Sequence, residues 1–496
     1  MKNIVKKFSA NKFLIFASCI VMFAIFLRFY NYENRWGLAY DQAHDAIISK
    51  YALDNHKLPL LGPFSSAGPF QTGGEWYWLL MIPLSLYPNS IYSPWIFITI
   101  IYVFFVGMCI YVGKQFNGPW FGLLFGFFAA ISTAQIAQSV NLTNQSPHAI
   151  LGLLGILNMI FFVRTKKTKY LFFLSFCIGL SVSIHLQGVA LGVLLLITLG
   201  ITRALNIRNI LVIILGGIIP LLSIITYDAN NDWFNIRNMF WYYFHDQYKI
   251  SLDVLGRRWL TFGSIFIPTS WAHVIGGYKV MGYIEIFGII TIFIYLLLKK
   301  KITQEILIIC ISVLGMFIMI RYTRTPLYDS YLVFMHPFIL ILTSYFIYIL
   351  YKYNRFISII LFFFIIGATL YRDRLEINGG SNLSAVNSRI LIANLIRKYP
   401  NESFSIYDKD LRSTDKSLPL VLFLYFEGKI SDKGRRIGIT TKTDKDVIRF
   451  PIITNSDGGY ALFDLNRSSN NELNSDRWAF VNPSAIYKST EEWYHK

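Results

Sequence analysis

Two carboxylates and an imidazole, at Asp41, His44 and Asp45, lie close together near the start of the chain. The stretch 41–53 has helical spacing, so Asp41 and Asp45, four residues apart, would project from one face of a helix. Two like charges on one face repel each other unless a cation, a metal ion or a substrate hydroxyl lies between them. This stretch follows a long hydrophobic segment, and ionisable residues that a membrane protein places there usually serve a function. It is therefore the first candidate for a site.

The composition identifies the chain as a membrane protein. Of its 496 residues 54% are hydrophobic and only 15% are charged, and the mean hydropathy is +0.46. A helix needs about 20 apolar residues to cross the hydrocarbon layer. Runs of roughly that length recur and predict about eleven spans, at 13–29, 94–113, 119–137, 149–163, 170–186, 189–202, 210–227, 280–298, 306–320, 331–350 and 356–370. The expected fold class is a polytopic α-helical membrane protein.

Basic residues alternate along the connections between these segments. Every second connection is rich in lysine or arginine, and positive loops stay in the cytoplasm. The N-terminus is therefore expected inside, whereas the long loop 31–93 and all residues after Tyr371 are expected outside. The alternative that 13–29 is a cleaved signal peptide is disfavoured, because no small-x-small cleavage site follows it. The basic positions are Lys2, Lys6, Lys7, Lys12, Lys114, 164–169, Arg203, Arg208, 299–301, Lys352 and Arg355.

This topology also explains the net charge of +18. Much of it lies in the predicted cytoplasmic loops, where anionic lipid headgroups attract it. Membrane lipids are thus expected partners, and nucleic acid is not.

After Tyr371 the composition changes to dense and nearly balanced charge. We expect two domains, a membrane domain over 1–371 and a small extracytoplasmic α/β domain over 372–496. In the second, periodicity predicts a helix over 388–397, strands over 403–407, 437–441 and 460–464, and either a helix or a buried strand over 418–426. All four cysteines lie in predicted spans, so no disulfide is expected in the outer domain.

The outer loop 31–93 is far longer than a connection needs to be, and loops of that length are usually functional. Its second half contains glycine- and proline-rich turns and then Glu75 and Tyr77 among tryptophans. Glu75 would either contact substrate or steady the loop.

These residues resemble the integral-membrane glycosyltransferases of the GT-C superfamily, in particular the protein O-mannosyltransferases and the bacterial lipid A aminoarabinose transferases (glycosyltransferase 39-type). Both branches follow the first span with an Asp-Glu pair, then short helices along the membrane, then a Gly/Pro-Tyr-Tyr-like entry to the second span. Residues 40–44, Tyr-Asp-Gln-Ala-His, are similar to an Asp-Glu-x-His version of the pair, and 74–79, Gly-Glu-Trp-Tyr-Trp-Leu, to the entry. Residues 324–332, followed by His336 and Pro337, are similar to the Arg-Tyr-Leu-Pro stretch that opens a late span. The resemblance covers the whole membrane portion.

The resemblance implies transfer of a sugar from a polyprenyl-phosphate-linked donor to an extracytoplasmic lipid, glycan or protein acceptor at the plasma (inner) membrane. Asp41 would be the catalytic base that takes the acceptor's proton, with inversion at the anomeric carbon. Cationic groups would receive the leaving phosphate, first Arg321 and Arg324. The residues expected to bind substrate are Gln42, His44, Asp45, Lys50, Glu75, Tyr77, Arg257, Arg258, Arg321, Arg324 and Tyr328.

The sequence departs from the family pattern at Gln42, which replaces the second acid of the pair. A site with two carboxylates would then need Asp45 or Glu75. Participation of a divalent metal, as in some relatives, stays open.

Several plainer interpretations remain beside these. Asp41 could cap the helix that follows it, and Asp45 could lie on a solvated face or pair with Lys50 or His44. Arg321 and Arg324 could be interfacial anchors at the headgroups. Two other function classes also remain. One is a transporter or flippase, although paired broken helices in two related halves are missing from the sequence. The other is a lipid-linked glycan ligase or polymerase, which the long outer segment 228–277 keeps open.

Overall fold

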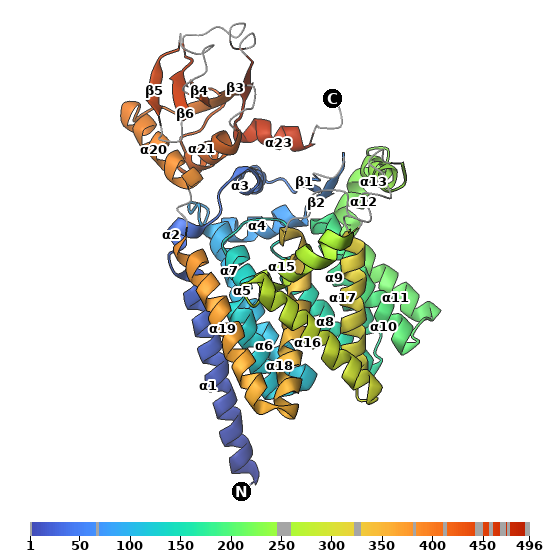
Figure 1. Cartoon of the computed structure of the whole chain (residues 1–496). Helices are drawn as coiled ribbons and strands as arrows, with labels where there is room; N and C mark the ends of the chain where they lie inside the picture. The colour runs from blue at the N-terminus through green and yellow to red at the C-terminus, as the bar shows by residue number, and fades with distance from the viewer. Residues whose placement is uncertain are drawn as a thin grey trace.

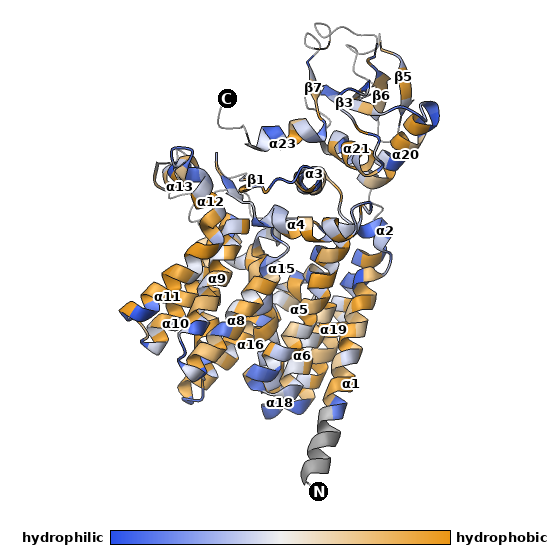
Figure 2. Ribbon diagram, turned by 180° about the vertical axis from the view of Figure 1, so that it is seen from behind, coloured by the Kyte–Doolittle hydropathy of each residue, from blue (hydrophilic) through white to orange (hydrophobic). Residues whose placement is uncertain are grey.

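The computed structural model confirms a helical membrane protein with a small α/β domain at one end of the helix bundle (Figure 1). It describes residues 2–65, 69–245, 259–321, 329–379, 383–409, 414–441, 450–455, 460–466, 473 and 477–491. Figure 2 shows apolar residues along most of the length of the bundle helices and polar residues toward their ends. Helices that are apolar around most of their circumference are typical of membrane spans.

Among the described residues, eight helical segments are long and apolar enough to cross a membrane. Six are single helices and two include a short 3-10 turn. They are α1 (Lys2–Phe29), α5 (Ser93–Asn117), α8 (His148–Thr165), α11 (Ile207–Ile218) with η2 (Ile219–Leu221) and α12 (Leu222–Ala229), α16 (Lys279–Leu298), α17 (Gln304–Arg321), η4 (Asp329–Met335) with α18 (His336–Tyr353), and α19 (Arg355–Asn378).

The other three predicted spans also coincide with helices. The helix α9 (Lys169–Ile184) is shorter, as is α10 (Gly192–Thr202), which continues the 3-10 turn η1 (Leu186–Leu191). The segment 119–137 is broken into α6 (Pro119–Ile131) and α7 (Thr133–Ser139), which are bent by 58°. The count of eleven spans therefore stays a prediction, whereas every segment is helical.

The bend between α6 and α7 is held from two sides by neighbouring helices. Arg28 of α1 is buried and donates to the carbonyl oxygens of Ala129 and Ala130 at 3.1 and 3.0 Å, where α6 ends. The Thr133 hydroxyl, at the start of α7, donates to the carboxylate of Asp373 in α19 at 2.6 Å. A cation thus lies at the carbonyl end of one helix and an acid at the amide end of the next, as the helix dipoles favour.

The loop 31–93, named the outer loop after the side predicted for it, forms short elements along one end of the bundle, which is likewise named the outer end. These are α2 (Tyr32–Arg35), α3 (Tyr40–Asp54), an antiparallel pair of strands β1 (Leu61–Phe64) and β2 (Gln71–Gly73), and α4 (Glu75–Leu86). The prediction of a helix over 41–53 is confirmed by α3. Its Ala43, Ala46 and Ile47 are fully buried. The helix α3 packs on α4 on one side and on the outer domain on the other (Figure 1). These two contacts fix its position in the fold.

The helix α13 (Phe234–His245) follows α12, and α15 (Ile267–Val274) follows the π-helical turn η3 (Phe262–Phe266). The buried Asp228 caps α13 by accepting from the backbone amides of Asn235 and Ile236 at 3.2 and 2.9 Å. Asn235 in turn accepts from the backbone amide of Gln71 at 2.9 Å. The strand β2 is thereby fixed to the outer end of the bundle.

The outer domain is a five-stranded sheet in the order β5-β6-β4-β3-β7 with helices packed against it. Only the pair β3 and β4 is parallel, with Ile406 opposite Ile437. Parallel neighbours need a crossover, and α21 supplies it, so the helical alternative for 418–426 is the correct one. The elements are α20 (Leu383–Lys398), β3 (Phe404–Lys409), α21 (Thr414–Phe426), β4 (Arg435–Thr441), β5 (Ile452–Asn455), β6 (Tyr460–Asp464), β7 (Trp478–Phe480) and α23 (Pro483–Glu491).

The predicted helix over 388–397 and strands over 403–407, 437–441 and 460–464 are confirmed by α20, β3, β4 and β6. The short strands β5 and β7 and the helix α23 were not predicted. The boundary placed after Tyr371 falls within α19, because this helix continues beyond the apolar run to Asn378. The start of the outer domain at residue 372 therefore stays an expectation.

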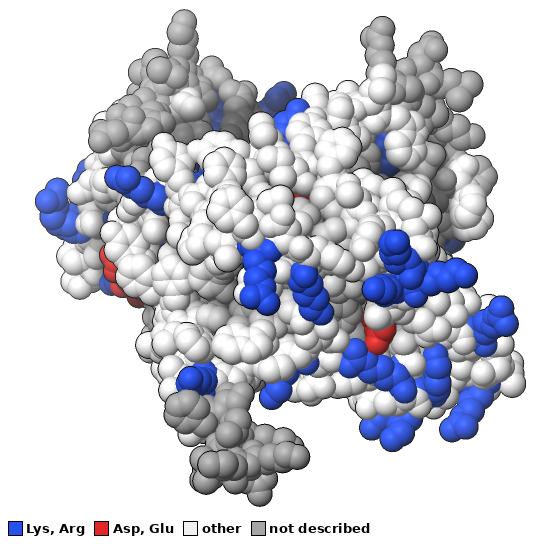
Figure 3. Space-filling view, turned by 60° about the horizontal axis from the view of Figure 1, so that its bottom comes forward, with Lys and Arg blue, Asp and Glu red and all other residues white. Residues whose placement is uncertain are grey.

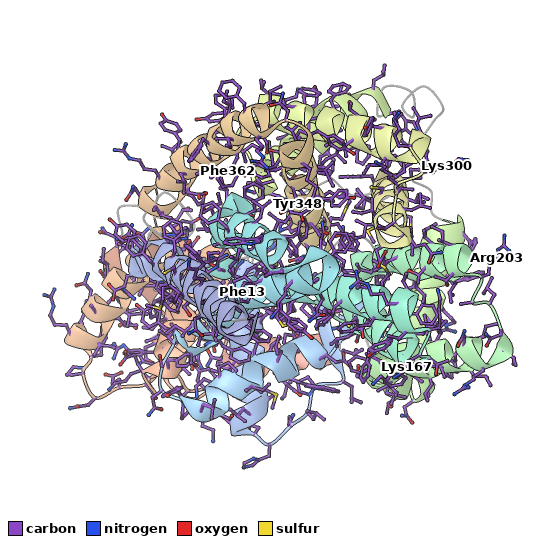
Figure 4. The ribbon with its side chains drawn as sticks, turned by 90° about the horizontal axis from the view of Figure 1, so that it is seen from below. Phe13, Lys167, Arg203, Lys300, Tyr348 and Phe362 are labelled. Carbon is purple, nitrogen blue, oxygen red and sulfur yellow. The ribbon has the colours of Figure 1, made fainter. Side chains whose placement is uncertain are left out.

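The outer domain and the N-terminus lie at opposite ends of the bundle (Figure 1). Figure 3 shows the end away from the outer domain, where Lys and Arg side chains greatly outnumber Asp and Glu. Figure 4 looks at the same end, at which Lys167, Arg203 and Lys300 follow α8, α10 and α16. The basic connections thus gather on one face, as the alternation in the sequence predicts.

Candidate active site

Asp41 lies in the first turn of α3 and is exposed. Its carboxylate lies near the N-terminus of the helix, where the unsatisfied backbone amides carry partial positive charge. Tyr40, also exposed, stacks on His44 with ring centroids 5.8 Å apart. The helix α3, which carries these residues, lies between the helix bundle and the outer domain (Figure 1).

Asp45 is buried and has a different environment from Asp41. Its carboxylate accepts from the indole N–H of Trp76 at 2.7 Å and lies 3.1 Å from Nδ1 of His44. A carboxylate can only accept, so this contact places the proton on Nδ1 of His44. Protein donors thus occupy Asp45, in place of the cation or hydroxyl expected between the two acids. Its alternative pairing with Lys50 is not observed.

The Tyr77 phenol is affected by the charges of both Asp45 and Asp41. Its side chain is fully buried in α4, and burial together with the charge of Asp45 raises the pKa of its phenol well above the ordinary value. Asp41 adds to this effect. The phenol therefore keeps its proton and lies within electrostatic reach of both carboxylates.

Gln42 is a capping residue. Its Oε1 accepts from the backbone amide of Ala39 at 3.0 Å, which is one half of a capping box. Its Nε2 donates to Oδ1 of Asn141 at 3.0 Å. Both ends of the amide are therefore used to fix the start of α3.

Glu75 joins three separate helices at the start of α4. Its two carboxylate oxygens accept from the hydroxyls of Ser183 and Ser223, at 2.5 and 2.6 Å. Ser183 lies near the end of α9 and Ser223 in α12, and both are buried. Of the two expected roles for Glu75, these contacts favour steadying the loop.

Lys50 faces the outer domain. Its ammonium lies 3.1 Å from the Asp54 carboxylate, and 5.0 and 5.3 Å from the ring centroids of Tyr425 and Phe426. The Tyr425 hydroxyl donates to Asp54 at 2.6 Å. Cation–π and hydrogen-bond contacts of this kind hold the domain on α3.

Arg321, at the outer end of α17, is buried, and its guanidinium lies 5.2 Å from the ring centroid of Trp259. It is therefore held among protein groups, unlike a freely snorkelling anchor. The other four candidates, Arg257, Arg258, Arg324 and Tyr328, lie outside the described residues.

Several polar residues near this end of the bundle were not predicted. Gln135 of α7 lies 2.5 Å from His336, and buried His148 lies 2.9 Å from the carbonyl of Ser181. Asn141 accepts from Gln42 and Trp76 donates to Asp45, both of which are residues of α3. None of these partners shares a local pattern with the residue that it contacts, so the sequence carried no signal for them.

A divalent metal has no suitable ligand set in the described part of the chain. No three His, Cys, Asp or Glu side chains come together there as a metal site requires. Where the family pattern has its second acid, the two neutral amides of Gln42 and Asn141 satisfy each other. We therefore derive no step through a metal.

Solved structures of other proteins share this fold. Two crystal structures of ArnT from Cupriavidus metallidurans match it, with TM-scores of 0.60 in the apo state and 0.63 with bound undecaprenyl phosphate. They cover 92 and 93% of this chain and 98 and 99% of their own, at 10 and 11% identity. The oligosaccharyltransferase of Archaeoglobus fulgidus, in a complex with Zn and sulfate, matches with a TM-score of 0.50 and 12% identity. That match covers 78% of this chain and 55% of the archaeal one.

The sequence matches no family model and no curated protein. At 10 to 12% identity, the structural likeness establishes the fold. It confirms the fold that the motifs of the outer loop predict.

Proposed function

We propose that this protein transfers a sugar from a polyprenyl-phosphate donor to an acceptor on the outer face of the plasma membrane, with inversion. The observation that carries the proposal is the position of Asp41. It is an exposed carboxylate on a fixed helix, at the outer end of a bundle that has the ArnT fold over nearly its whole length. In one of the two ArnT structures that protein binds undecaprenyl phosphate.

Asp41 acts as the general base. It accepts the proton of the acceptor's hydroxyl or amine while the acceptor attacks the anomeric carbon from the face opposite the phosphate. The bond from the anomeric carbon to the phosphate oxygen breaks, and the electron pair leaves with the phosphate. Asp45, held by Trp76 and His44, remains outside this step and keeps the first two turns of α3 in place.

The departing polyprenyl phosphate needs positive charge at the outer membrane surface. Arg321 is the first candidate in the described part of the chain, because it ends α17 at that level. Arg324, Tyr328, Arg257 and Arg258 are proposed as further contacts, and His44 and Tyr77 as groups that shape the sugar site.

The orientation is part of the proposal. The basic face of the bundle lies in the cytoplasm with the N-terminus, and the outer domain over 372–496 lies outside, where it covers α3. Nucleotide-activated sugars stay in the cytoplasm, so a site on the outer face requires a donor linked to lipid.

The test is turnover of a panel of labelled polyprenyl-phosphate sugars by the purified protein in lipid, with a membrane extract as acceptor. We expect consumption of at least one donor and a product of inverted anomeric configuration. Retention of configuration, or consumption of a nucleotide sugar in place of every lipid-linked donor, would contradict the proposal.

A further inference from the structure

The start of α3 is connected to a distant part of the chain by two side-chain amides. Gln42 and Asn141 are 99 residues apart in sequence, and their side chains form one hydrogen bond of 3.0 Å. Gln42 directly follows Asp41, so whatever fixes Gln42 also fixes the first turn that presents the base. The direction of this hydrogen bond determines whether position 141 must supply a donor or an acceptor.

The direction is set by the backbone. Oε1 of Gln42 accepts from the backbone N–H of Ala39 at 3.0 Å, and a backbone N–H can only donate. The NH2 group of Gln42 must then point away from Ala39, toward Asn141. Asn141 consequently has to present an oxygen, Oδ1, at this position. The amide orientation, often ambiguous, is here determined by the network.

Asn141 is itself fixed on its own side. Its backbone carbonyl accepts from the Ser146 hydroxyl at 2.9 Å, and its backbone pairs with Gly37 in an isolated bridge. A Cβ at Gly37 would lie 2.8 Å from Oδ1 of Asn141, so a side chain there would displace the acceptor. Trp95 holds the carbonyl of Gly37 at 2.7 Å.

The connection that carries Asn141 follows α7, the short helix beyond the bend. The bend depends on Arg28 of α1 and Asp373 of α19, described above. The Thr99 hydroxyl donates to the carbonyl of Ser139 at the end of α7, at 2.6 Å. Asn141 is thus held by the bundle and can serve as a fixed point for α3.

We infer that Asn141 is a positioning residue for Asp41 and acts through Gln42 as an oriented acceptor. The inference rests on the proposed function, because the role of Asp41 as base belongs to it. The pair needs one donor and one acceptor between positions 42 and 141, with position 42 also accepting from Ala39. Substitutions that keep this donor and acceptor should therefore keep activity, and substitutions that remove either one should lose it.

Asn141→Asp keeps the acceptor, so we expect kcat within about threefold of wild type. Asn141→Leu removes it, and kcat should fall about 10- to 100-fold, with little change in KM for the donor, because a displaced base slows the chemical step. Gln42→Glu should be tolerated, since Asn141 can turn its NH2 group toward the new carboxylate. The double variant Gln42→Glu with Asn141→Asp places two carboxylates, which can only accept, against each other. Its activity should fall as far as that of Asn141→Leu.

Asn144→Leu is the matched control. Asn144 lies on the same connection, and its NH2 group donates to the carbonyl of Ile184, away from α3. It should leave kcat near the wild-type value. Wild-type kcat in Asn141→Leu, or a double variant as active as its two single variants, would overturn the inference.

Hydrogen exchange of the peptide over residues 37–45 supplies a readout that needs no turnover. Exchange should accelerate at least threefold in Asn141→Leu and in the double variant, and stay unchanged in Asn141→Asp. Unchanged exchange in Asn141→Leu would overturn the positioning role even if no donor turns over. If Asp41→Asn abolishes turnover while Asn141→Leu has none of these effects, the proposed function stands and the inference alone falls.

Discussion

Among the individual side chains, Glu75 is a candidate site residue whose observed contacts all join parts of the bundle. Its carboxylate joins α4 to α9 and α12 through Ser183 and Ser223. Hydrogen bonds to a charged group contribute about 1.5–3 kcal/mol each. Glu75→Gln keeps only one good acceptor, so we predict a loss of about 1–3 kcal/mol in the free energy of unfolding, measured in detergent.

The control for this prediction is a double-mutant cycle. Ser223→Ala in the wild-type background should cost more than Ser223→Ala in the Glu75→Gln background, because the partner is already weakened. Strictly additive losses would show that the contact does not bear on stability, and Glu75 would return to the candidates for substrate binding.

The sequence identified the segment that carries the candidate site residues, but not the distant residues that they contact in the fold. Helical spacing placed Asp41 and Asp45 four residues apart on α3, as observed. It could not reveal that Asp45 is buried against Trp76, or that Gln42 contacts Asn141. Such contacts join residues that are 31 and 99 positions apart, and spacing within one element carries no information about them.

Among the secondary-structure elements, the bend between α6 and α7 depends most clearly on outside support. Arg28 donates to three carbonyls, of Ala24, Ala129 and Ala130. Arg28→Met leaves the carbonyls at the end of α6 without these donors. We predict a loss of about 2–5 kcal/mol in the free energy of unfolding.

Lys12→Met is the comparison for this prediction, because Lys12 is an exposed cation of the same helix. It should change stability by no more than about 0.5 kcal/mol. Equal losses in the two variants would mean that Arg28 does not hold the bend.

The length of the apolar runs predicted the eleven long helical segments of the bundle, because spans are long and uniformly apolar. It missed the bend, since the run 119–137 is apolar on both sides of Ser132 and the supports come from residues 28 and 373. It also missed β5, β7 and α23, which are too short to show a period of their own. Their places are set by neighbouring strands.

For the molecule as a whole, the contact between the outer domain and α3 is the main connection between its two parts. Burial and the hydrogen bond to Asp54 raise the pKa of Tyr425, so its phenol stays protonated and donates to Asp54. We predict that Tyr425→Phe raises hydrogen exchange in the last two turns of α3 about three- to tenfold, since a local contact is lost.

Tyr407→Phe is the matched control, because the Tyr407 ring packs on Phe480 within the sheet, away from α3. It should leave exchange in α3 unchanged. Unchanged exchange in Tyr425→Phe as well would show that the domain does not constrain α3.

The orientation in the membrane can be tested with the same molecule. All four cysteines lie in bundle helices, so exposed cysteines introduced by mutation report on each face. We predict that an impermeant maleimide added to intact cells labels Glu427→Cys in the outer domain but not Lys300→Cys on the basic face. The reverse pattern would place the site in the cytoplasm and contradict a lipid-linked donor on the outer side.

The central claim is that Asp41 removes the acceptor's proton during transfer from a lipid-linked sugar. The most direct measurement is the release of polyprenyl phosphate from a labelled donor in the presence of acceptor, compared between wild type and Asp41→Asn of equal thermal stability. We predict a loss of at least 100-fold in Asp41→Asn, because the amide cannot accept the proton. Release at the wild-type rate would contradict this role and leave Asp41 as a residue of the first turn of α3 that takes no part in the transfer.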